Sequence, residues 1–486
     1  MLSFLNISSG RGAGIQFISP EFFFFFAAVF FLYRLLSHRN QNFLLLAASY
    51  LFYASWGPGY LALLIGVTVF QFYCGQRIAA SESAANRKFF LLLSLLGGIG
   101  TLVFFKYGNI LLGGLTASMG GQPPWFRILL PVGLSFYTFQ TLSYTIDIYW
   151  RRAEPVKRLS EFALFVSFFP QLLAGPIERV HSFLPQIVNP RTVTPEYFQE
   201  GGRLIFLGVY QKIFIADNLS RLVEPYFVSP APYNGVEVLL MVYAFAFQLY
   251  CDFAGYSNIA RGLAKCLGFE LRVNFDTPYL ARDPADFWRR WHMSLYGWLR
   301  DYVYVPLTYG VERKSYGVAY RSTLIVMLLG ALWHGISWNY ILWGVFAAAQ
   351  IIGYVNYRKL RGGAVSEISG IAGAVVVIVK WTLIFHFGVC LGWLIARTTS
   401  LQQFYEMASS LWLHFQPLPS HGGLVIKLIF YVWLIAMIEI FQRRSGEFWF
   451  FKSWPAELRW AVYTIMAVSM VLFGQQGGKL FIYFQF

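Results

Sequence analysis

The stretch Leu328–Gly344, LLGALWHGISWNYILWG, places one ionisable side chain, His334, inside a long apolar run. An imidazole is costly to bury at membrane depth, and ionisable residues kept there commonly serve function. If the whole run is one helix, Gly330 and Ala331 lie one turn before His334 on the same face, which leaves open space beside the ring. The same two residues equally suit a core histidine in a close helix contact. The stretch alone leaves both interpretations open.

The same assumption places Ser337 and Trp338 one turn after His334, where the indole forms a wall above the imidazole. With Trp333 and the face formed by Gly330 and Ala331, these residues are the candidates for lining a substrate channel.

The composition is that of a membrane protein. Of 486 residues, 57% are hydrophobic, 20% are aromatic and only 13% are charged, whereas a soluble domain carries about 25% charged residues. Apolar runs of about 17–25 residues, enough to cross a bilayer as helices, recur from end to end. We predict an all-α polytopic membrane protein with about ten to twelve transmembrane helices plus re-entrant and interfacial helices. No internal repeat divides the chain, so residues 1–486 are expected to form a single domain.

The net charge of +15 fits cytoplasmic loops and anionic lipid as a partner, and no segment resembles a nucleic-acid-binding module. The four cysteines form no CxxC pair and are expected to be small buried hydrophobes, with neither a disulfide framework nor a metal site. They are Cys74, Cys251, Cys266 and Cys390.

Basic residues mark the cytoplasmic side of each apolar run. The first run, Phe22–Leu36, has its positive charges after it, which predicts an uncleaved span with the N-terminus outside. The segment Phe162–Gly175 contains Pro170 and is too interrupted for a simple crossing, so we expect a re-entrant element. Asp252, at the end of the run Val236–Phe253, is interpreted as a residue at the membrane surface. Further crossings are expected at Phe43–Trp56, Tyr60–Cys74 (after the turn Gly57-Pro58-Gly59), Phe89–Phe105, Ile128–Trp150, Leu204–Ala216, Leu324–Gly335, Tyr340–Tyr354, Ile371–Ile395, Leu424–Phe441 and Trp460–Phe473.

The segment Asp283–Pro306 predicts an amphipathic helix at the cytoplasmic interface. Asp283 and Pro284 are a strong helix start, and Pro306 marks the other end. An aromatic stripe at helical spacing includes Trp291, and His292 borders it. A histidine here is ordinarily a packing residue, but a second histidine in the next apolar segment makes His292 a catalytic candidate beside His334.

At this point the two segments resemble the signature regions of the membrane-bound O-acyltransferases, in particular the bacterial branch that acetylates alginate. The matching regions are WRRWHMSLYGWLRDYVYVPL and LLGALWHGISWNYILWG, supported by FFPQLLAGPIER (Phe168–Arg179), YCDFAGYSNIARGLA (Tyr250–Ala264), NFDTPYLARDPADFW (Asn274–Trp288) and FIYFQF (Phe481–Phe486). A relative in the same superfamily, the D-alanyl-transfer protein of teichoic acid modification, shares the two-histidine core. Within the motifs, Glu178-Arg179 is where we expect variation among relatives.

The resemblance implies helices around a central funnel or tunnel, with His334 near its constriction and His292 as the upstream histidine of the motif. It further implies transfer of acetyl groups from a cytoplasmic thioester, acetyl-CoA, across a bacterial inner membrane to a polysaccharide, through a partner acetyltransferase in the periplasm. The donor is a substrate, and no tightly bound cofactor is expected.

Acyl transfer to a hydroxyl needs a base, and histidine, with an unperturbed pKa of about 6.5, suits that task. His334 is expected to be the general base or a transient acyl carrier, and the space at Gly330 and Ala331 to admit the acetyl group. His292 is expected to orient or polarise the donor. The basic stretch Arg261–Arg321 is expected to face the cytoplasm and the phosphates of the donor, and its residues Arg289, Arg290 and Arg300 are candidates for the donor site or channel.

The chief rival class is a multi-pass transporter, but the paired broken helices of inverted repeats are not seen in the sequence. The acceptor polymer stays open. An alginate-like exopolysaccharide is favoured, and peptidoglycan, cellulose or D-alanyl transfer to teichoic acid are the alternatives.

Overall fold

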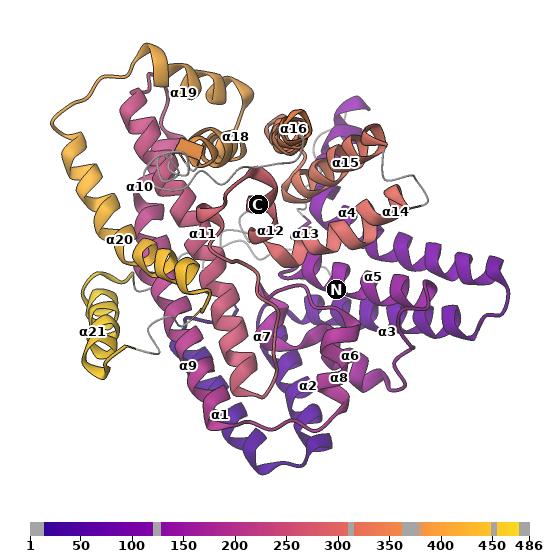
Figure 1. The fold of residues 1–486 in the computed structure, drawn as a ribbon. Coiled ribbons are helices and arrows are strands. Elements are labelled where there is room, and N and C mark those ends of the chain that lie inside the picture. The colour runs from indigo at the N-terminus through magenta and orange to yellow at the C-terminus, as the bar shows by residue number, and fades with distance from the viewer. Residues whose placement is uncertain are drawn as a thin grey trace. The chain divides into compact units, whose positions relative to one another are not determined.

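A computed structural model describes residues 14–119, 128–309, 315–361, 379–380, 382–448 and 454–475 (Figure 1). All regular elements in these ranges are helices, which confirms the all-α prediction. The chain separates into two compact units, the first comprising Met1–Phe206 and Tyr256–Arg272 and the second Leu207–Gly255 and Val273–Phe486. The expected single domain and central funnel stay predictions.

The first unit contains the N-terminal helices, of which α3, α4 and α5 pack against one another and α2 packs against α6. The tight turn Gly57-Pro58-Gly59 is confirmed: Gly57 has φ +144° and α3 begins at Pro58. Its helices are α1 (Pro20–Leu35), α2 (His38–Ala54), α3 (Pro58–Ala80), α4 (Ala84–Ser118), α5 (Leu134–Tyr149), α6 (Leu159–Ser167), α7 (Phe169–Leu172), α8 (Val180–Val188) and the start of α9 (Pro195–Val209).

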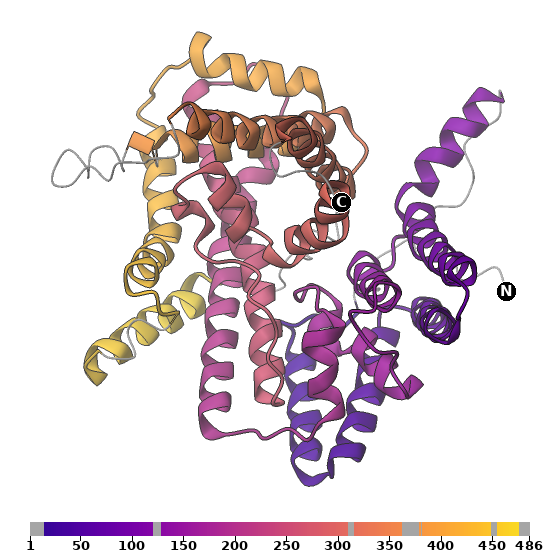
Figure 2. The same ribbon diagram turned by 45° about the vertical axis from the view of Figure 1, so that its right-hand side comes forward.

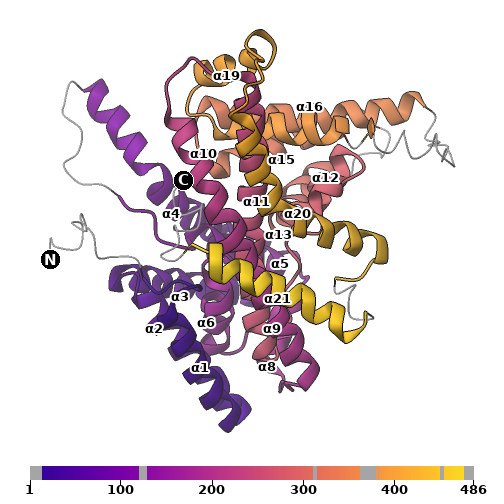
Figure 3. The same cartoon turned by 90° about the vertical axis from the view of Figure 1, so that its left-hand side faces the viewer.

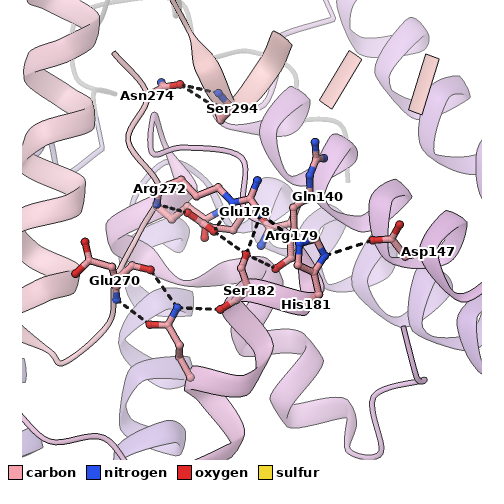
Figure 4. A network of polar contacts seen from close by, with 12 residues as sticks. Gln140, Asp147, Glu178, Arg179, His181, Ser182, Glu270, Arg272, Asn274 and Ser294 are labelled. Carbon is pink, nitrogen blue, oxygen red and sulfur yellow. Dashed lines mark hydrogen bonds and ion pairs between the residues drawn. The ribbon is translucent and has the colours of Figure 1, made fainter. Parts of the chain in front are cut away.

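The segment expected to be re-entrant is two short buried helices, α6 and α7, interrupted at Phe168. Glu178 and Arg179, which follow them, are each only 1% exposed. The Arg272 backbone N–H donates to Glu178 Oε1 at 2.7 Å, and the Ser182 hydroxyl lies 3.4 Å from Oε2 (Figure 4). Burial raises the pKa of Glu178 to about 7 against the effect of the Arg272 N–H. The pair that sequence reasoning treated as variable therefore belongs to a buried polar network.

The second unit holds the remaining helices and every candidate site residue. In chain order they are η2 (Tyr210–Ala216), α10 (Asp217–Val228), α11 (Gly235–Cys266, with residues 256–266 in the first unit), η3 (Pro278–Leu280), α12 (Pro284–Arg290), α13 (Met293–Leu299), η4 (Arg300–Tyr304), α14 (Val305–Thr308), α15 (Tyr316–His334), α16 (Trp338–Leu360), η5 (Ile384–Cys390), α18 (Leu391–Arg397), α19 (Leu401–Leu413), α20 (His421–Ser445) and α21 (Ala456–Phe473).

Seven of the described helices are long and apolar enough to cross a membrane, so the chain is a multi-pass membrane protein. They are α3, most of α4, α11, α15, α16, α20 and α21. Other expected crossings correspond to shorter helices such as α1 and α2, and part of Ile371–Ile395 lies outside the described residues. The expected total of about ten to twelve therefore stays a prediction.

The helix formed by α9, η2 and α10 runs along α11, and glycines set how closely the two approach (Figure 2). A Cβ on Gly255 would lie 2.8 Å from the Gly208 carbonyl oxygen in the second unit, and one on Gly262 would lie 2.5 Å from the Gly201 carbonyl oxygen in the first. Such approaches leave no room for a side chain.

The same pairing in the second unit places Lys212, within the π-helical segment η2, beside α11. Its Nζ lies 2.7 Å from Asp217 Oδ1 and 2.7 Å from Asp252 Oδ1, and all three side chains are buried. The interpretation of Asp252 as a membrane-surface residue is therefore wrong, because a buried ammonium compensates its charge. At the start of the stretch expected to face the cytoplasm, α11 continues to Cys266 and Arg261 is 9% exposed, and the side of the membrane that the stretch faces stays a prediction.

The C-terminal helices α20 and α21 both pack against η2 (Figure 3). All four cysteines are buried thiols, as predicted. The motif Phe481–Phe486 lies outside the described residues.

Candidate functional site

His334 is the last residue of α15, at the turn of the hairpin that α15 forms with α16. Three aromatic rings surround its half-buried imidazole: Trp333, Trp343 and Tyr340, with centroids at 4.7, 5.2 and 6.2 Å. A partly exposed imidazole between aromatic walls can meet a substrate while its orientation is restricted.

The assumption of one helix through Leu328–Gly344 is wrong, because the helix breaks directly after His334. Gly335 ends α15, and the Tyr340 ring lies 2.6 Å from where a Cβ on Gly335 would stand. The Ser337 hydroxyl then caps α16 by accepting the Tyr340 N–H at 3.4 Å. Ser337 is thus a helix cap, and Trp338, 71% exposed, is no wall above the imidazole.

The opening for the acetyl group expected at Gly330 and Ala331 stays a prediction. A Cβ on Gly330 would meet the Tyr296 hydroxyl at 3.4 Å, which is ordinary van der Waals contact. Ala331 is 1% exposed, and its Cβ lies 3.0 Å from where a Cβ on Gly344 would stand. The small residues Ala331 and Gly344 let α15 pack closely against α16, which favours the second of the two interpretations of the sequence.

The predicted single helix Asp283–Pro306 is broken at His292. Its start is as expected, with the Asp283 carboxylate accepting the Asp286 N–H at 2.7 Å and Pro284 at the first position. His292 has φ +43°, in the left-handed region that histidine adopts more readily than most residues, and it separates α12 from α13. The helix also continues beyond Pro306, to Thr308.

The break turns the His292 side chain inward, so that it is 0% exposed. Trp288 and Trp291 on the expected stripe are likewise buried. A single helix with this histidine at its border is therefore a wrong description of the segment, whereas its place at the cytoplasmic interface stays a prediction.

Trp333 contacts both candidate histidines. Its ring centroid lies 5.8 Å from that of His292 and 4.7 Å from that of His334. Phe253 and Phe275 enclose the His292 ring further, at 4.6 and 6.2 Å. The structure thus brings the two histidines together around one indole.

The polar partner of His292 is Asn274, which sequence reasoning missed as a site residue although it opens a quoted motif. His292 Nδ1 lies 3.1 Å from Asn274 Oδ1, and the same oxygen accepts the Ser294 hydroxyl at 2.9 Å (Figure 4). Burial lowers the pKa of His292 to about 3, so this ring is neutral at physiological pH.

The remaining site residues predicted from the sequence have surroundings that differ from those of the two histidines. Trp291 packs among aromatic rings, including Trp393 at 4.8 Å, and is 2% exposed. Arg289 and Arg300 carry largely exposed guanidiniums beside Asp286 and Asp301, respectively. Arg290 is held by Asp276 and Asp286 and is mostly buried, and its expected role toward the phosphates of the donor stays a prediction.

An apolar pocket lies beside Trp343, the residue that also contacts His334. Its lining includes Phe287, Trp288, Trp343, Phe346, Gly388 and Trp393. Among the described residues no group of three or more His, Cys, Asp or Glu side chains gathers as metal ligands. The residues present can therefore supply imidazole acid–base chemistry next to an apolar surface.

Comparison with known proteins matches residues 156–396 to the membrane-bound O-acyltransferase family. A probable alginate O-acetylase of Pseudomonas aeruginosa is 40% identical over 385 residues, which cover 77% of this chain and 70% of the relative. A peptidoglycan O-acetyltransferase of Helicobacter pylori is 31% identical over 384 residues, covering 74% and 71%. A teichoic acid D-alanyltransferase of Streptococcus thermophilus is 32% identical over 246 residues, covering 47% and 57%.

Proposed function

The chain belongs to the membrane-bound O-acyltransferase family and is an O-acyltransferase of the membrane, and we propose that it transfers acetyl groups to an extracytoplasmic polysaccharide. The observation that carries the proposal is the pair of histidines around Trp333, because one of them is accessible enough to exchange protons with a substrate. The similarity to a probable alginate O-acetylase supports acetyl as the transferred group and an alginate-like polymer as the acceptor.

In the proposed reaction His334 is the general base. It takes the proton of the attacking hydroxyl while the oxygen attacks the thioester carbonyl, the C–O ester bond forms, and the C–S bond breaks. The leaving thiolate then receives a proton, and a positioned base contributes roughly 10²–10⁴ in rate. In the alternative His334 carries the acetyl group transiently, which splits the transfer into two steps.

The donor in this proposal is acetyl-CoA on the cytoplasmic side of a bacterial inner membrane, with the N-terminus of the chain outside. A partner acetyltransferase in the periplasm receives the acetyl group and passes it to the polymer. Arg289 and Arg300 remain available for the phosphates of the donor, because their guanidiniums are exposed.

The test is His334→Ala in cells that make the acetylated polymer. We expect alkali-labile acetate on the polymer to disappear while the amount of the protein in the membrane stays unchanged. The matched control is His414→Ala, an exposed histidine at the end of α19, which should leave acetylation as it is. Normal acetylation by the His334→Ala protein would refute the assignment.

The same cells identify the acceptor. Acetate released from exopolysaccharide supports an alginate-like or cellulose acceptor, whereas acetate released from purified cell wall points to peptidoglycan, the substrate named for the Helicobacter pylori relative. Release of D-alanine in place of acetate would favour the chemistry of the teichoic acid relative.

A further inference from the structure

The hydrogen bonds around His292 determine which of its ring nitrogens carries the proton. Asn274 Oδ1 accepts the Ser294 backbone N–H at 3.3 Å and the Ser294 hydroxyl at 2.9 Å. A main-chain N–H can only donate, so the atom of Asn274 at this place is the oxygen of its amide. His292 Nδ1, 3.1 Å from the same oxygen, must then be the N–H, because two lone pairs would repel each other.

A neutral imidazole has a single N–H, so the hydrogen on Nδ1 leaves a lone pair on Nε2. This Nε2 atom is fully buried, and none of the described residues supplies it with a hydrogen-bond partner. Buried acceptors ordinarily have a partner, so a lone pair kept in this state next to Trp333 indicates a place for a bound hydrogen-bond donor.

We propose that Asn274 is a positioning residue that holds His292 as the Nδ1–H tautomer, so that His292 Nε2 accepts the hydrogen of the attacking hydroxyl in the route in which His334 carries the acetyl group and releases it to that hydroxyl. This inference rests on the proposed function and replaces the expected role of His292 in polarising the donor. Polarising a thioester carbonyl requires a hydrogen-bond donor, whereas an Nε2 lone pair can only accept. In acyl transfer the attacking hydroxyl is the group that brings a hydrogen to such a lone pair.

A purely structural role for Asn274 must be separated from this one, because Asn274 also caps α13. Its carbonyl oxygen accepts the Met293 N–H at 2.8 Å and its side chain accepts the Ser294 N–H. Asn274→Asp keeps both functions, since a carboxylate accepts the same hydrogen bonds. It replaces the amide NH2 by a second carboxylate oxygen and places a negative charge beside Nδ1–H, while both capping contacts are kept, and it is therefore the decisive variant.

The sign of the expected effect follows from that charge. A carboxylate next to Nδ1–H favours the imidazolium and raises the pKa of His292 from about 3. The protonated ring has N–H on both nitrogens and cannot accept a hydrogen bond, so activity falls at low pH and recovers as the pH rises.

The elements that pack around the His292 ring also carry charged or titratable groups. These are Asp252 of α11 (which is paired with Lys212), Asp276 (which follows Phe275), Arg290 of α12 and His334 of α15.

The experiment measures thiol release from acetyl-CoA by the full-length protein in membranes between pH 5.5 and 8.5. For Asn274→Asp we expect the rate of thiol release to fall about tenfold for each pH unit below the raised pKa of His292, a decline that the wild type does not show. At the alkaline end the rate should be close to that of the wild type. Asn274→Ala, which lacks the acceptor, should lose activity at every pH without this decline at low pH. The control is Asn109→Asp, since Asn109 Oδ1 likewise accepts a main-chain N–H, that of Ile128, and makes no hydrogen bond to a histidine. This variant also loses the bond from Asn109 Nδ2 to the Ile128 carbonyl, but its pH profile should stay that of the wild type.

Two results would overturn the inference. Higher activity of Asn274→Asp at low pH would mean that His292 works as a hydrogen-bond donor. If the activity of the Asn274 variants falls only as much as the amount of protein in the membrane, with an unchanged pH profile, Asn274 acts only as a helix cap. Failure of the proposed function is distinguishable, because the wild-type protein would then release no thiol at any pH.

Discussion

His334 and His292 both contact Trp333, yet their surroundings differ in kind. His334 ends a helix at a turn, is half-buried and lies among aromatic rings on α15 and α16. His292 sits at a strained backbone position, is wholly buried and is held by a side-chain amide. The first arrangement suits a group that exchanges protons with a substrate, and the second suits a group whose tautomer and orientation must not change.

The largest effect is expected from removing both imidazoles. If they act in one step, His334→Ala should cost roughly 10²–10⁴ in rate and the double variant with His292→Ala only a few-fold more, because residues that act as a unit are not additive. Rates are measured by thiol release and normalised to membrane protein. A double variant whose loss equals the product of the single losses would show that the two histidines act independently, and their shared contact with Trp333 would then have no mechanistic meaning.

The hairpin of α15 and α16 that positions His334 depends on close packing at Gly344. Replacing this glycine is expected to have the next largest effect. A Cβ there would lie 3.0 Å from Ala331 Cβ and 3.1 Å from the Met327 carbonyl oxygen, so α15 and α16 must move apart. We expect Gly344→Ala to cost about 1–3 kcal/mol in the free energy of unfolding and to lower activity, since Trp343 beside it touches His334.

Gly353→Ala, on the same helix, is the matched control for this variant. A Cβ at Gly353 meets nothing within 4 Å, so alanine should be neutral or stabilising by up to about 1 kcal/mol. Thermal unfolding of the two purified variants measures the difference. Equal melting temperatures would mean that the hairpin tolerates separation and that close packing does not hold His334.

Features set by local chemistry could be predicted from the sequence. The apolar runs identify a multi-pass helical protein, Gly57-Pro58 ends one helix and starts the next, and Asp283 caps α12 as its position suggests. Each of these depends on neighbours within a few residues, which a single sequence displays directly.

The features that failed depend on distant partners. The aromatic stripe around His292 has helical spacing, and nothing nearby reveals that Asn274 takes the first N–H groups of α13 and thereby stabilises a break. Asp252 looks like a surface residue until Lys212 on another helix is placed beside it. Periodicity reports which face is apolar, but it does not report which residue compensates a buried charge.

The smallest expected effect concerns Gly330, and it tests whether His334 needs open space on its own helix face. A Cβ at this position would be 3.4 Å from the Tyr296 hydroxyl and 3.5 Å from Leu299 Cδ1, distances that require no movement. Gly330→Ala should therefore change stability by no more than about 1 kcal/mol, the range of the helix propensity difference, and leave thiol release within a few-fold of wild type. A collapse of activity in a stably folded Gly330→Ala protein would instead show that this glycine leaves room for the acetyl group. The access route to His334 would then run along α15, and the contrast between an accessible and an enclosed histidine would have to be redrawn around that opening.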